Sequence, residues 1–463
     1  MRDPIVRSSR TRLPLGPRIV VAGTHSGVGK TTVATGLMAA LGNRGVEVAP
    51  AKVGPDFIDP GYHALATGRP GRNLDAWMCG ADEVAGLAAR AAEGADVLVV
   101  EGVMGLFDGA ADGTPSSTAE VAKLIDAPVV LVVDASAMSS SVAAVVHGFA
   151  TLDPAVPVAG VVLNRVASDG HESMLRQALE PLGIPVVGVL RRNDQFVWRD
   201  RHLGLVPVVE HSEVITESLG RLAADIDRGC DLEAIMGLAR RAPDRVVHGP
   251  ALPADVTGSR TVRIAVAGGA AFSFAYPDNL EALAAAGAEI VPFDPLSDGL
   301  PEEIDALIAG GGFPEVFAAD LSANRALAAD VVHRVRNGLV VWAECGGLLW
   351  LAARLDGAEM VGVVPTEAAM SDRLTLGYRT GRTLVETPFG PPGLDLRGHE
   401  FHYSGVSPSG DAIALAGRDG SGVGGFAGPK LLATYLHLHL GSRPDLAAAF
   451  VRAAARDPGS TME

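Results

Sequence analysis

The segment GTHSGVGKTT, residues 23–32, most constrains what this chain can fold into. It follows an apolar, β-branched run at residues 18–22 and opens a helical pattern at residues 31–41. Glycines let backbone N–H groups curl around phosphate oxygens, and the N-terminus of a helix adds a favourable potential. The strict form of this loop has glycine at position 24, where this chain has Thr24 and its first glycine one residue earlier. Because run, loop and helix are in register, the segment predicts a nucleotide-phosphate site rather than a plain glycine-rich turn.

The residues expected to bind the nucleotide are Gly27, Gly29, Lys30, Thr31 and Thr32. In a loop of this kind, the lysine reaches the β- and γ-phosphates, and the hydroxyl of the following residue can hold Mg²⁺. We therefore expect Lys30 and Thr31 to carry the chemistry of this site.

Carboxylates follow two further strand patterns. Residues 96–101 (DVLVVE) indicate a buried strand, and Glu101 lies at its carboxyl end, where open α/β sheets bind ligands. The next residues, GVMGLFDG, bring Asp108 into the same loop. Such carboxylates suit Mg²⁺, directly or through water. A solvated acidic loop end is the alternative.

The loop KVGPDFIDPGYH, residues 52–63, follows another strand pattern. Its two prolines and two glycines indicate a rigid connection near the carboxyl edge of the sheet. Lys52 would meet anions, and Asp56 and Asp59 could bind a metal ion or a substrate. Taken alone, these residues are equally consistent with a simple Pro-Asp turn that has no binding function.

Apolar runs alternate with Ala- and Leu-rich helical patterns over the first half of the chain. The runs lie at residues 18–22, 46–52, 97–101, 129–133, 158–164 and 186–189. Strands buried on both faces and alternating with helices predict an α/β fold with a mainly parallel sheet and helices on both faces. A second α/β alternation begins after residue 260, and the chain becomes glycine-rich and strand-like beyond Arg373.

The length of 463 residues suits several domains of about 100–200 residues each. Residues 242–260 mix proline, glycine and charge without apolar periodicity, which is typical of a linker. We therefore expect a disordered lead at residues 1–17, a nucleotide-binding domain at residues 18–241 and a second α/β domain at residues 261–463.

The formal net charge of −16 argues against general binding to nucleic acid or to anionic membranes, which requires basic surface. The three cysteines are far apart, so neither a disulfide framework nor a Cys-based zinc site is expected. No apolar run has the length needed to span a bilayer. We expect a cytoplasmic protein without a nucleic-acid or membrane partner.

Cys345 stands in the sequence AECGGLL, between a strand pattern and a helix. At such a turn the helix potential favours the reactive thiolate, and small neighbours let a substrate approach. Backbone N–H groups beside it can form an oxyanion hole, together with the GGGFPE segment at residues 310–315. A lone cysteine otherwise packs as a small apolar side chain, which is the role expected of Cys79 and Cys230.

A base for Cys345 is available in ATYLHLHL, residues 433–440. His437 and His439 are two residues apart on a strand-like run and thus share a face. His437 could orient and deprotonate the thiol, whereas the roles of His399 and His402 are less clear. A metal site built on these histidines is the alternative, but His-x-His without another well-spaced ligand is weak evidence for one.

Several motifs occur in a fixed order over about the whole chain: GTHSGVGKTT, KVGPDFIDPGYH, GRPGRNLDAWM, EGVMGLFDG, GGGFPE, AECGGLLWL, LGYR, GHEFHYS and ATYLHLHL. Together they resemble the cobyrinate/hydrogenobyrinate a,c-diamide synthases of cobalamin biosynthesis. The resemblance implies a P-loop domain like that of dethiobiotin synthetase, followed by a class I, triad-type glutamine amidotransferase domain. It also implies ATP- and glutamine-dependent amidation of the a and c carboxylates of the corrinoid, through an acyl phosphate and ammonia released from glutamine.

For the amidotransferase domain, the resemblance implies Cys345 as nucleophile and His437 as its base. His439 stands where triad enzymes usually have the orienting carboxylate of a His-x-Glu motif, so the third member of the triad stays open. L-glutamine is the implied nitrogen donor. Because free ammonia is mostly protonated at neutral pH, a protected route for it between the domains is expected.

For the P-loop domain, the resemblance implies ATP and Mg²⁺ as cofactors and cobyrinate or hydrogenobyrinate as substrate. The metal ligands would be Thr31, Glu101 and Asp56, and the groups that contact substrate or intermediate would be Lys52, Asp56 and Asp108. Basic side chains must meet the polycarboxylate, and the candidates are Arg69, Arg72, Arg191, Arg192, Arg199 and Arg201. A homodimer is left open.

Three rivals remain at this point. Nickel-sirohydrochlorin a,c-diamide synthase and cobyric acid synthase are built on the same frame, although the GPDFIDPGYH loop and the paired His-x-His favour the a,c-diamide group over cobyric acid synthase. A non-catalytic nucleotide switch would leave Cys345 without a role. It would also need a basic amphipathic tail, and residues 443–456 lack a basic face.

Overall fold

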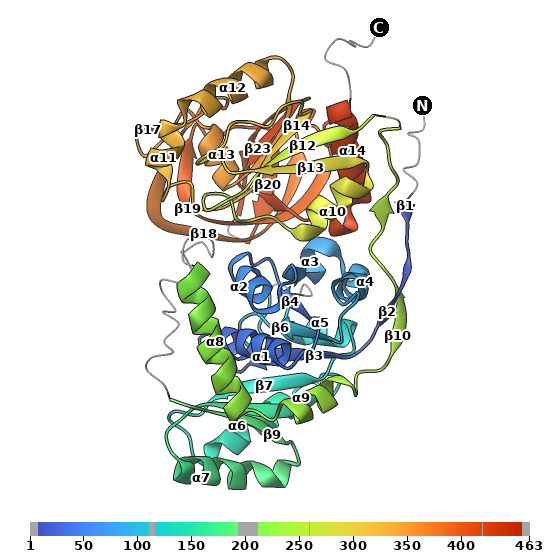
Figure 1. Cartoon of the computed structure of the whole chain (residues 1–463), viewed down its shortest axis with the longest axis vertical. Coiled ribbons are helices and arrows are strands. Elements are labelled where there is room, and N and C mark those ends of the chain that lie inside the picture. Colours follow the sequence, from blue (N-terminus) through green and yellow to red (C-terminus); the bar gives the residue numbers. More distant parts are fainter. Residues whose placement is uncertain (1–7, 111–115, 193–211, 259, 419, 456–463) are drawn as a thin grey trace. The chain divides into compact units, whose positions relative to one another are not determined.

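The computed structural model describes residues 8–110, 116–192, 212–258, 260–418 and 420–455. The chain forms two compact units. The N-terminal unit comprises Arg10–Pro250, and the C-terminal unit comprises Ala251–Glu463 together with Met1–Ser9. Each unit is built around a sheet with helices packed against it (Figure 1). The boundary at Pro250 falls inside the segment expected as a linker.

A seven-stranded parallel sheet forms the centre of the N-terminal unit. Its order is β5 (Arg72–Leu74), β4 (Val48–Val53), β6 (Val97–Glu101), β3 (Arg18–Gly23), β7 (Val129–Asp134), β8 (Val158–Val166) and β9 (Val186–Arg191). Every residue of β3, β4 and β6 is buried. Burial of successive residues requires cover on both faces of a sheet, which explains why these strands are continuous apolar runs.

The helices of the N-terminal unit alternate with its strands. They are α1 (Lys30–Asn43), α2 (Ile58–Thr67), α3 (Ala76–Cys79), α4 (Ala81–Ala91), α5 (Thr118–Leu124), α6 (Ser141–Thr151), α7 (Asp169–Leu179), α8 (Ser212–Gly229) and α9 (Leu232–Ala239). One core cluster joins apolar residues of α1, α8 and α9 to inward residues of β3, β6 and β7. The predicted alternation of a parallel α/β domain is thus confirmed.

The C-terminal unit has a six-stranded central sheet. Its order is β13 (Ala288–Phe293), β12 (Val262–Ala267), β14 (Ala306–Ala309), β15 (Val340–Glu344), β23 (Leu431–Thr434) and β22 (Phe426–Gly428), and β22 alone of these is antiparallel to its neighbour. Alternate residues of its strands enter two different cores: Leu307 and Val341 belong to one, and Ile308 and Trp342 to the other. This period of two is expected of strands covered on both faces.

Helices and a second sheet complete the C-terminal unit. The helices are α10 (Pro277–Ala285), α11 (Ala318–Ala323), α12 (Arg325–Arg336), α13 (Gly346–Leu351) and α14 (Pro444–Ala455). The second sheet contains β17 (Ala358–Glu359), β16 (Arg354–Leu355), β18 (Glu367–Thr383), β19 (Asp395–Ser407) and β24 (His437–Leu438), and β20 (Ile413–Gly417) and β21 (Gly420–Gly424) extend it. The antiparallel pairing of β24 with β19 places His437 opposite His399.

The expected lead and linker contain paired strands. β2 (Arg12–Leu15) pairs with β10 (Arg245–His248), and β1 (Ser8–Ser9) pairs with β11 (Leu252–Pro253). The buried Arg18 guanidinium supports this region by donating to backbone carbonyls that include those of Leu15, Gly16 and Pro243. These short strands could not be predicted from the sequence, because each obtains its hydrogen bonds from a segment far away along the chain.

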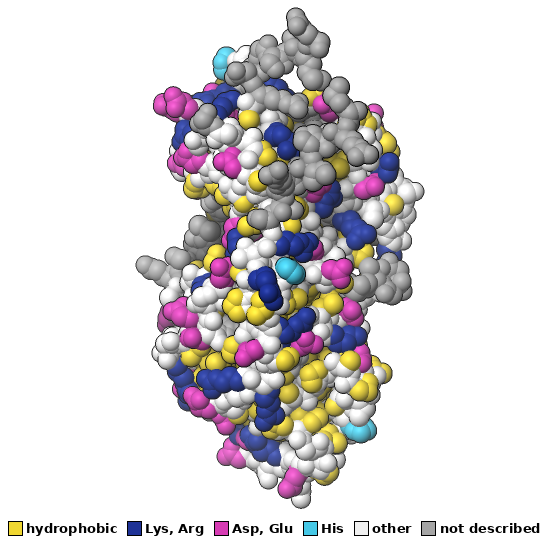
Figure 2. All heavy atoms as spheres, turned by 90° about the vertical axis from the view of Figure 1, so that its right-hand side faces the viewer, with side chains coloured by type: hydrophobic (Ala, Val, Ile, Leu, Met, Phe, Trp, Pro, Cys, Tyr) yellow, Lys and Arg dark blue, Asp and Glu magenta, His cyan; other side chains and the backbone are white. Residues whose placement is uncertain are grey.

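Among the described residues, no helix combines the length and the apolar character that crossing a lipid bilayer requires. On the face of the molecule shown in Figure 2, acidic and basic side chains are interspersed with apolar ones.

Candidate active sites

Residues 24–29 connect β3 to α1 in the N-terminal unit and form the phosphate loop. Gly27 and Gly29 have φ angles of 80° and 97°, in the left-handed region that favours glycine. A Cβ atom at Gly23 would lie 2.4 Å from Cγ1 of Val28. This close approach accounts for a glycine one residue before the position of the strict motif.

Two residues at the end of β8 hold the phosphate loop. Asn164 Nδ2 donates a hydrogen bond to the carbonyl of Val28 at 2.9 Å, and a Cβ atom at Gly29 would lie 2.3 Å from the same nitrogen. Arg165 has a left-handed φ of 61° and donates to the carbonyl of Gly27 at 3.0 Å. Neither residue is predicted to have a role, because a polar pair after an apolar run is a weak signal.

Lys30 and Thr31 begin α1 beside the loop. The Lys30 ammonium lies 3.4 Å from the carbonyl of His25, and burial together with the nearby charge of Lys52 lowers its pKa. The Thr31 hydroxyl donates to Glu101 Oε1 at 2.6 Å. All the residues predicted to bind the nucleotide lie on the loop or on the first turn of this helix.

Glu101, fully buried at the end of β6, accepts three hydrogen bonds from side chains. The donors are the Thr31 hydroxyl, the Lys52 ammonium at 2.9 Å and His63 Nε2 at 2.7 Å. Burial would raise the pKa of Glu101, but the charge of Lys52 and the hydrogen bonds from His63 and Thr31 lower it below its ordinary value. Glu101 is therefore ionised. His63 lies within the loop predicted at residues 52–63 but was not predicted to have a function.

Lys52 links Glu101 to further carboxylates. Its ammonium donates to Asp59 and lies 3.8 Å from Asp56 Oδ2. Burial would lower the pKa of Lys52, but these carboxylates raise it. Burial and the charges of Asp56 and Glu101 raise the pKa of Asp59 well above its ordinary value, despite Lys52. Burial and the neighbouring carboxylates thus disfavour a charge on Asp59, which a bound cation would favour.

These oxygens fit magnesium bound to a nucleotide. The Thr31 hydroxyl lies 2.6 Å from Glu101 Oε1 and 3.4 Å from Asp59 Oδ2, so three hard oxygen donors meet beside the phosphate loop. Within the described residues, no group of three or more His, Cys, Asp or Glu side chains is arranged to hold a metal ion. Mg²⁺ does not need such a cage, because it usually takes one or two carboxylates and completes its shell with water and phosphate.

Asp56, predicted both as a metal ligand and to contact substrate, and Asp108, predicted to contact substrate, also hold local structure. Asp56 Oδ1 accepts two backbone N–H groups at the start of α2, at 2.8 and 3.2 Å, and its other oxygen faces Lys52. Asp108 accepts the backbone N–H of Gly105 at 2.9 Å, and its charge opposes the lowering of the pKa of Lys30. Asp108 is exposed.

Two of the arginines predicted to meet the corrinoid are used by the N-terminal unit itself. Arg69 donates to backbone carbonyls after α4, and Arg191 pairs with Asp169 and Glu172 of α7. Arg72 begins the edge strand β5, Arg192 follows β9, and Arg199 and Arg201 lie outside the described residues.

In the C-terminal unit, Cys345 occupies the turn between β15 and α13. Its φ and ψ are 46° and −100°, a conformation that residues with a Cβ rarely adopt and that marks functional turns. A Cβ atom at Gly347 would lie 2.0 Å from the carbonyl oxygen of Ala309, and one at Gly346 would lie 3.0 Å from the nitrogen of Gly312. The two glycines after the cysteine are therefore needed for α13 to start against β14.

His437 reaches Cys345 from β24. Burial would lower the pKa of His437, but hydrogen bonds with Cys345 and Glu344 raise it to about 10. His437 Nδ1 lies 3.4 Å from Glu344 Oε2. A Cβ atom at Gly311 would lie 2.6 Å from Cε1 of His437, so the predicted oxyanion segment lies against the imidazole. The structure thus brings Cys345, His437 and the glycine segment together.

His439 is linked to the other histidines through Tyr276, whose ring contacts both His399 and His439. Its Nε2 lies 3.8 Å from Asp278 Oδ2, and its ring centroid lies 4.6 Å from that of Tyr276. Its Nδ1 accepts the backbone N–H of Gly441 at 3.1 Å. β24 ends at Leu438, and the backbone of His439 is still extended, with φ −112° and ψ 113°.

His399 and His402 each stack on another ring near this site. The His399 ring stacks on His437 with centroids 4.9 Å apart, and burial followed by the charge of His437 lowers its pKa well below the ordinary value. The His402 ring stacks on Tyr435 at 3.7 Å, and burial lowers its pKa to about 4. Both rings are therefore neutral at neutral pH.

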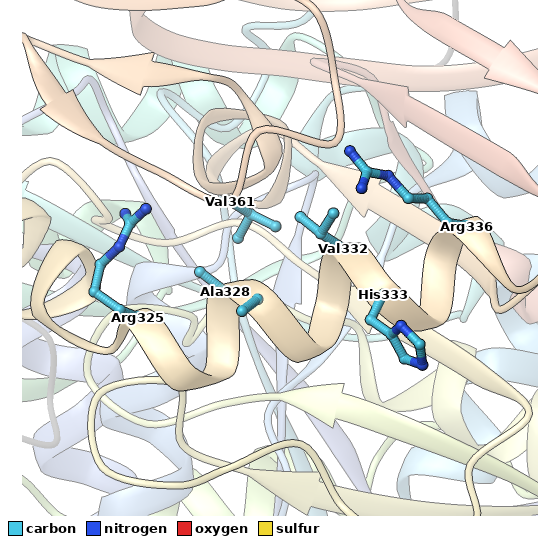
Figure 3. A pocket seen from close by; sticks show the side chains of 7 residues that line it. Arg325, Ala328, Val332, His333, Arg336 and Val361 are labelled. Atoms are coloured by element: carbon cyan, nitrogen blue, oxygen red, sulfur yellow. The ribbon is translucent and has the colours of Figure 1, made fainter.

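A hollow on α12 contains none of these residues. It is lined by side chains of that helix, among them Arg325, His333 and Arg336, and by Val361 (Figure 3). It has no part in the chemistry argued from the cysteine turn.

Comparisons with known proteins cover both units. Residues 19–205 match the CobQ/CobB/MinD/ParA nucleotide binding domain, and residues 263–445 match the CobB/CobQ-like glutamine amidotransferase domain. The chain is 49% identical to the hydrogenobyrinate a,c-diamide synthase of Streptomyces coelicolor, over 94% of this chain and 97% of that protein. It is 45% identical to the enzyme of the same name from Mycobacterium bovis and 43% identical to the cobyrinate a,c-diamide synthase of Syntrophotalea carbinolica, in each case over 94% of this chain and 98% of the relative.

Proposed function

This chain belongs to the family of hydrogenobyrinate and cobyrinate a,c-diamide synthases, and we propose that its preferred substrate is hydrogenobyrinate, the corrinoid without cobalt. It is a glutamine-dependent amidating ligase with a nucleotide-binding domain. The observation that carries the function is the strained Cys345 turn with His437 against it, in the same chain as a phosphate loop with a buried lysine. The two relatives named for hydrogenobyrinate are more similar to this chain than the relative named for cobyrinate, which supports the choice of substrate.

The N-terminal unit activates the corrinoid carboxylate. A carboxylate resists ammonia because its carbon is electron-rich and oxide is a poor leaving group. Transfer of the γ-phosphoryl group of ATP to the carboxylate oxygen gives an acyl phosphate, whose phosphate leaves readily. The loop amides and Lys30 position the phosphates and neutralise their charge. Mg²⁺, held by Thr31, Glu101 and Asp59, would supply charge neutralisation on the β- and γ-phosphate oxygens.

Lys52 and the acidic residues around it have supporting roles in this proposal. Glu101 fixes the Thr31 hydroxyl and Lys52, and His63 fixes Glu101. Asp56, Lys52 and Asp108 orient the carboxylate and its acyl phosphate in this proposal, which is supported by the pairing of Lys52 with Asp56 and by the charge of Asp108 near Lys30.

The C-terminal unit releases ammonia from glutamine. The Cys345 thiolate attacks the amide carbon, the C–N bond breaks, and ammonia leaves with a proton from His437. Water then attacks the thioester and gives its proton to His437, the C–S bond breaks, and glutamate is released. The acyl phosphate in the other unit takes up the ammonia and releases phosphate, which yields the amide.

With hydrogenobyrinate, MgATP and glutamine, we expect a product in which two carboxylates have become amides. Mass spectrometry of the product checks this, and parallel reactions with cobyrinate measure the preference as a ratio of kcat/KM. A ratio above one for hydrogenobyrinate supports the proposed substrate, and a ratio below one rejects it. A product with four new amides would contradict a,c-diamide synthesis and indicate cobyric acid synthase.

A further inference from the structure

A buried carboxylate, Glu344, holds His437 in two ways. Its Oε1 accepts the backbone N–H of Leu438 at 2.8 Å, and its Oε2 lies 3.4 Å from Nδ1 of His437. One oxygen thus fixes the chain beside the imidazole, and the other faces the ring. Since Glu344 immediately precedes Cys345, the same strand end carries the nucleophile and this carboxylate.

We propose that Glu344 is the residue that positions His437 and stabilises its protonated form during glutamine hydrolysis, taking the part that triad enzymes give to a carboxylate two residues after the histidine. The proposal rests on the proposed function of Cys345 and His437. A carboxylate at Nδ1 keeps a proton on that nitrogen and leaves the other ring nitrogen to exchange a proton with the thiol or with departing ammonia.

The backbone around His439 is held by Asn279. Asn279 Nδ2 donates to the carbonyl of Leu438 at 2.8 Å, and Asn279 Oδ1 accepts the backbone N–H of Leu440 at 2.6 Å. The backbone on both sides of His439 is therefore fixed by one buried side chain. The His439 ring consequently lies with Tyr276 and Asp278.

The other titratable groups near His437 do not supply a free negative charge to its imidazole. Glu400 pairs with Arg379, its Oε2 lying 3.0 Å from the Arg379 Nε, so its charge is compensated. His399 and His402 have lowered pKa values and are neutral. Within the described residues, the ion pair made by Glu344 is the one with His437. The charge of Glu344 therefore acts mainly on the imidazole.

Glu344→Gln is the decisive variant, because the amide oxygen can still accept the N–H of Leu438 while the charge is lost. We expect kcat for glutamine hydrolysis to fall about 100- to 10,000-fold, with KM for glutamine changed less than about two-fold. The pKa of His437, about 10 with Glu344 present, will fall without the carboxylate. The imidazolium that protonates departing ammonia will then lose its proton at a lower pH than in the wild type. The alkaline limb of the plot of rate against pH will therefore shift to lower pH. Glu344→Asp, which keeps the charge, will have a higher rate than Glu344→Gln and an alkaline limb closer to that of the wild type.

Three comparisons decide the outcome. Glu289→Gln, a matched change at an exposed strand position of the same unit, should leave glutamine hydrolysis unchanged. Synthesis with ammonium salt should survive in Glu344→Gln, which shows that the variant is folded. The proposal is overturned if Glu344→Gln hydrolyses glutamine normally, or if His439→Asn moves the alkaline limb and Glu344→Gln does not. Hydrolysis needs no corrinoid, so a wild-type chain that hydrolyses glutamine but makes no diamide contradicts the proposed function and leaves this inference standing.

Discussion

Replacing Cys345 by serine will lower glutamine-dependent diamide synthesis at least about 1,000-fold, while synthesis with ammonium salt stays within about two-fold of wild type. The serine hydroxyl fits the turn but is a far weaker nucleophile than the thiolate, so glutamine is no longer cleaved. The phosphate loop lies in a separately folded unit and is untouched by the change. Steady-state rates with glutamine and with ammonium chloride, measured on the same preparation, check the result.

Cys230→Ser is the matched control for this experiment. Burial raises the pKa of the Cys230 thiol to about 12, so it supplies no thiolate at neutral pH and both activities should persist. If Cys345→Ser also loses the ammonium-dependent reaction while its circular dichroism is that of wild type, nitrogen release and carboxylate activation are not separate. If it keeps the glutamine-dependent reaction, Cys345 is not the nucleophile.

Both turns at the centre of this chemistry could be predicted from sequence because their geometry is local. Gly27 and Gly29 adopt backbone angles that favour glycine, and Gly346 and Gly347 leave no room for a side chain. Steric demands of this kind appear in the sequence as glycines at set distances from Lys30 or Cys345. The alternation of buried strands and helices is local too, since each strand shows its own apolar run.

The partners of these groups could not be predicted in the same way, because they come from other elements. Asn164 reaches the phosphate loop from β8, and His63 reaches Glu101 from α2. Neither contact follows from spacing along the chain. The pairing of β2 with β10 joins segments from opposite ends of the N-terminal unit for the same reason.

The sequence alone also offers a reason to single out Glu344. An acid that ends a buried apolar strand is costly unless it is paired, and this argument singles out Glu101. The same reasoning applies to Glu344 at the end of β15, next to the cysteine. The spacing of His439 predicts a place in the triad, and this stays a prediction; its ring centroid lies 4.6 Å from that of Tyr276.

Replacing Lys30 by methionine will abolish diamide synthesis with either nitrogen donor, by at least about 100-fold in kcat, while glutamine hydrolysis continues. Methionine fills the nearly buried site of the lysine stem but lacks the charge that the transferring phosphoryl group requires. The variant is thus the mirror image of Cys345→Ser, which keeps carboxylate activation and loses nitrogen release. Corrinoid product and glutamate, quantified in the same reaction, separate the two effects.

Lys123→Met serves as the control, because its ammonium pairs with Glu120 and Asp153 on the surface of the same unit and should affect neither rate. Retention of synthesis by Lys30→Met would place carboxylate activation outside the phosphate loop. Loss of glutamine hydrolysis together with synthesis would mean that the cysteine site works only when the nucleotide site is intact, and the two reactions would then be coupled rather than independent. Binding of ATP to Lys30→Met, measured by calorimetry, distinguishes a lost phosphate contact from a lost transfer step.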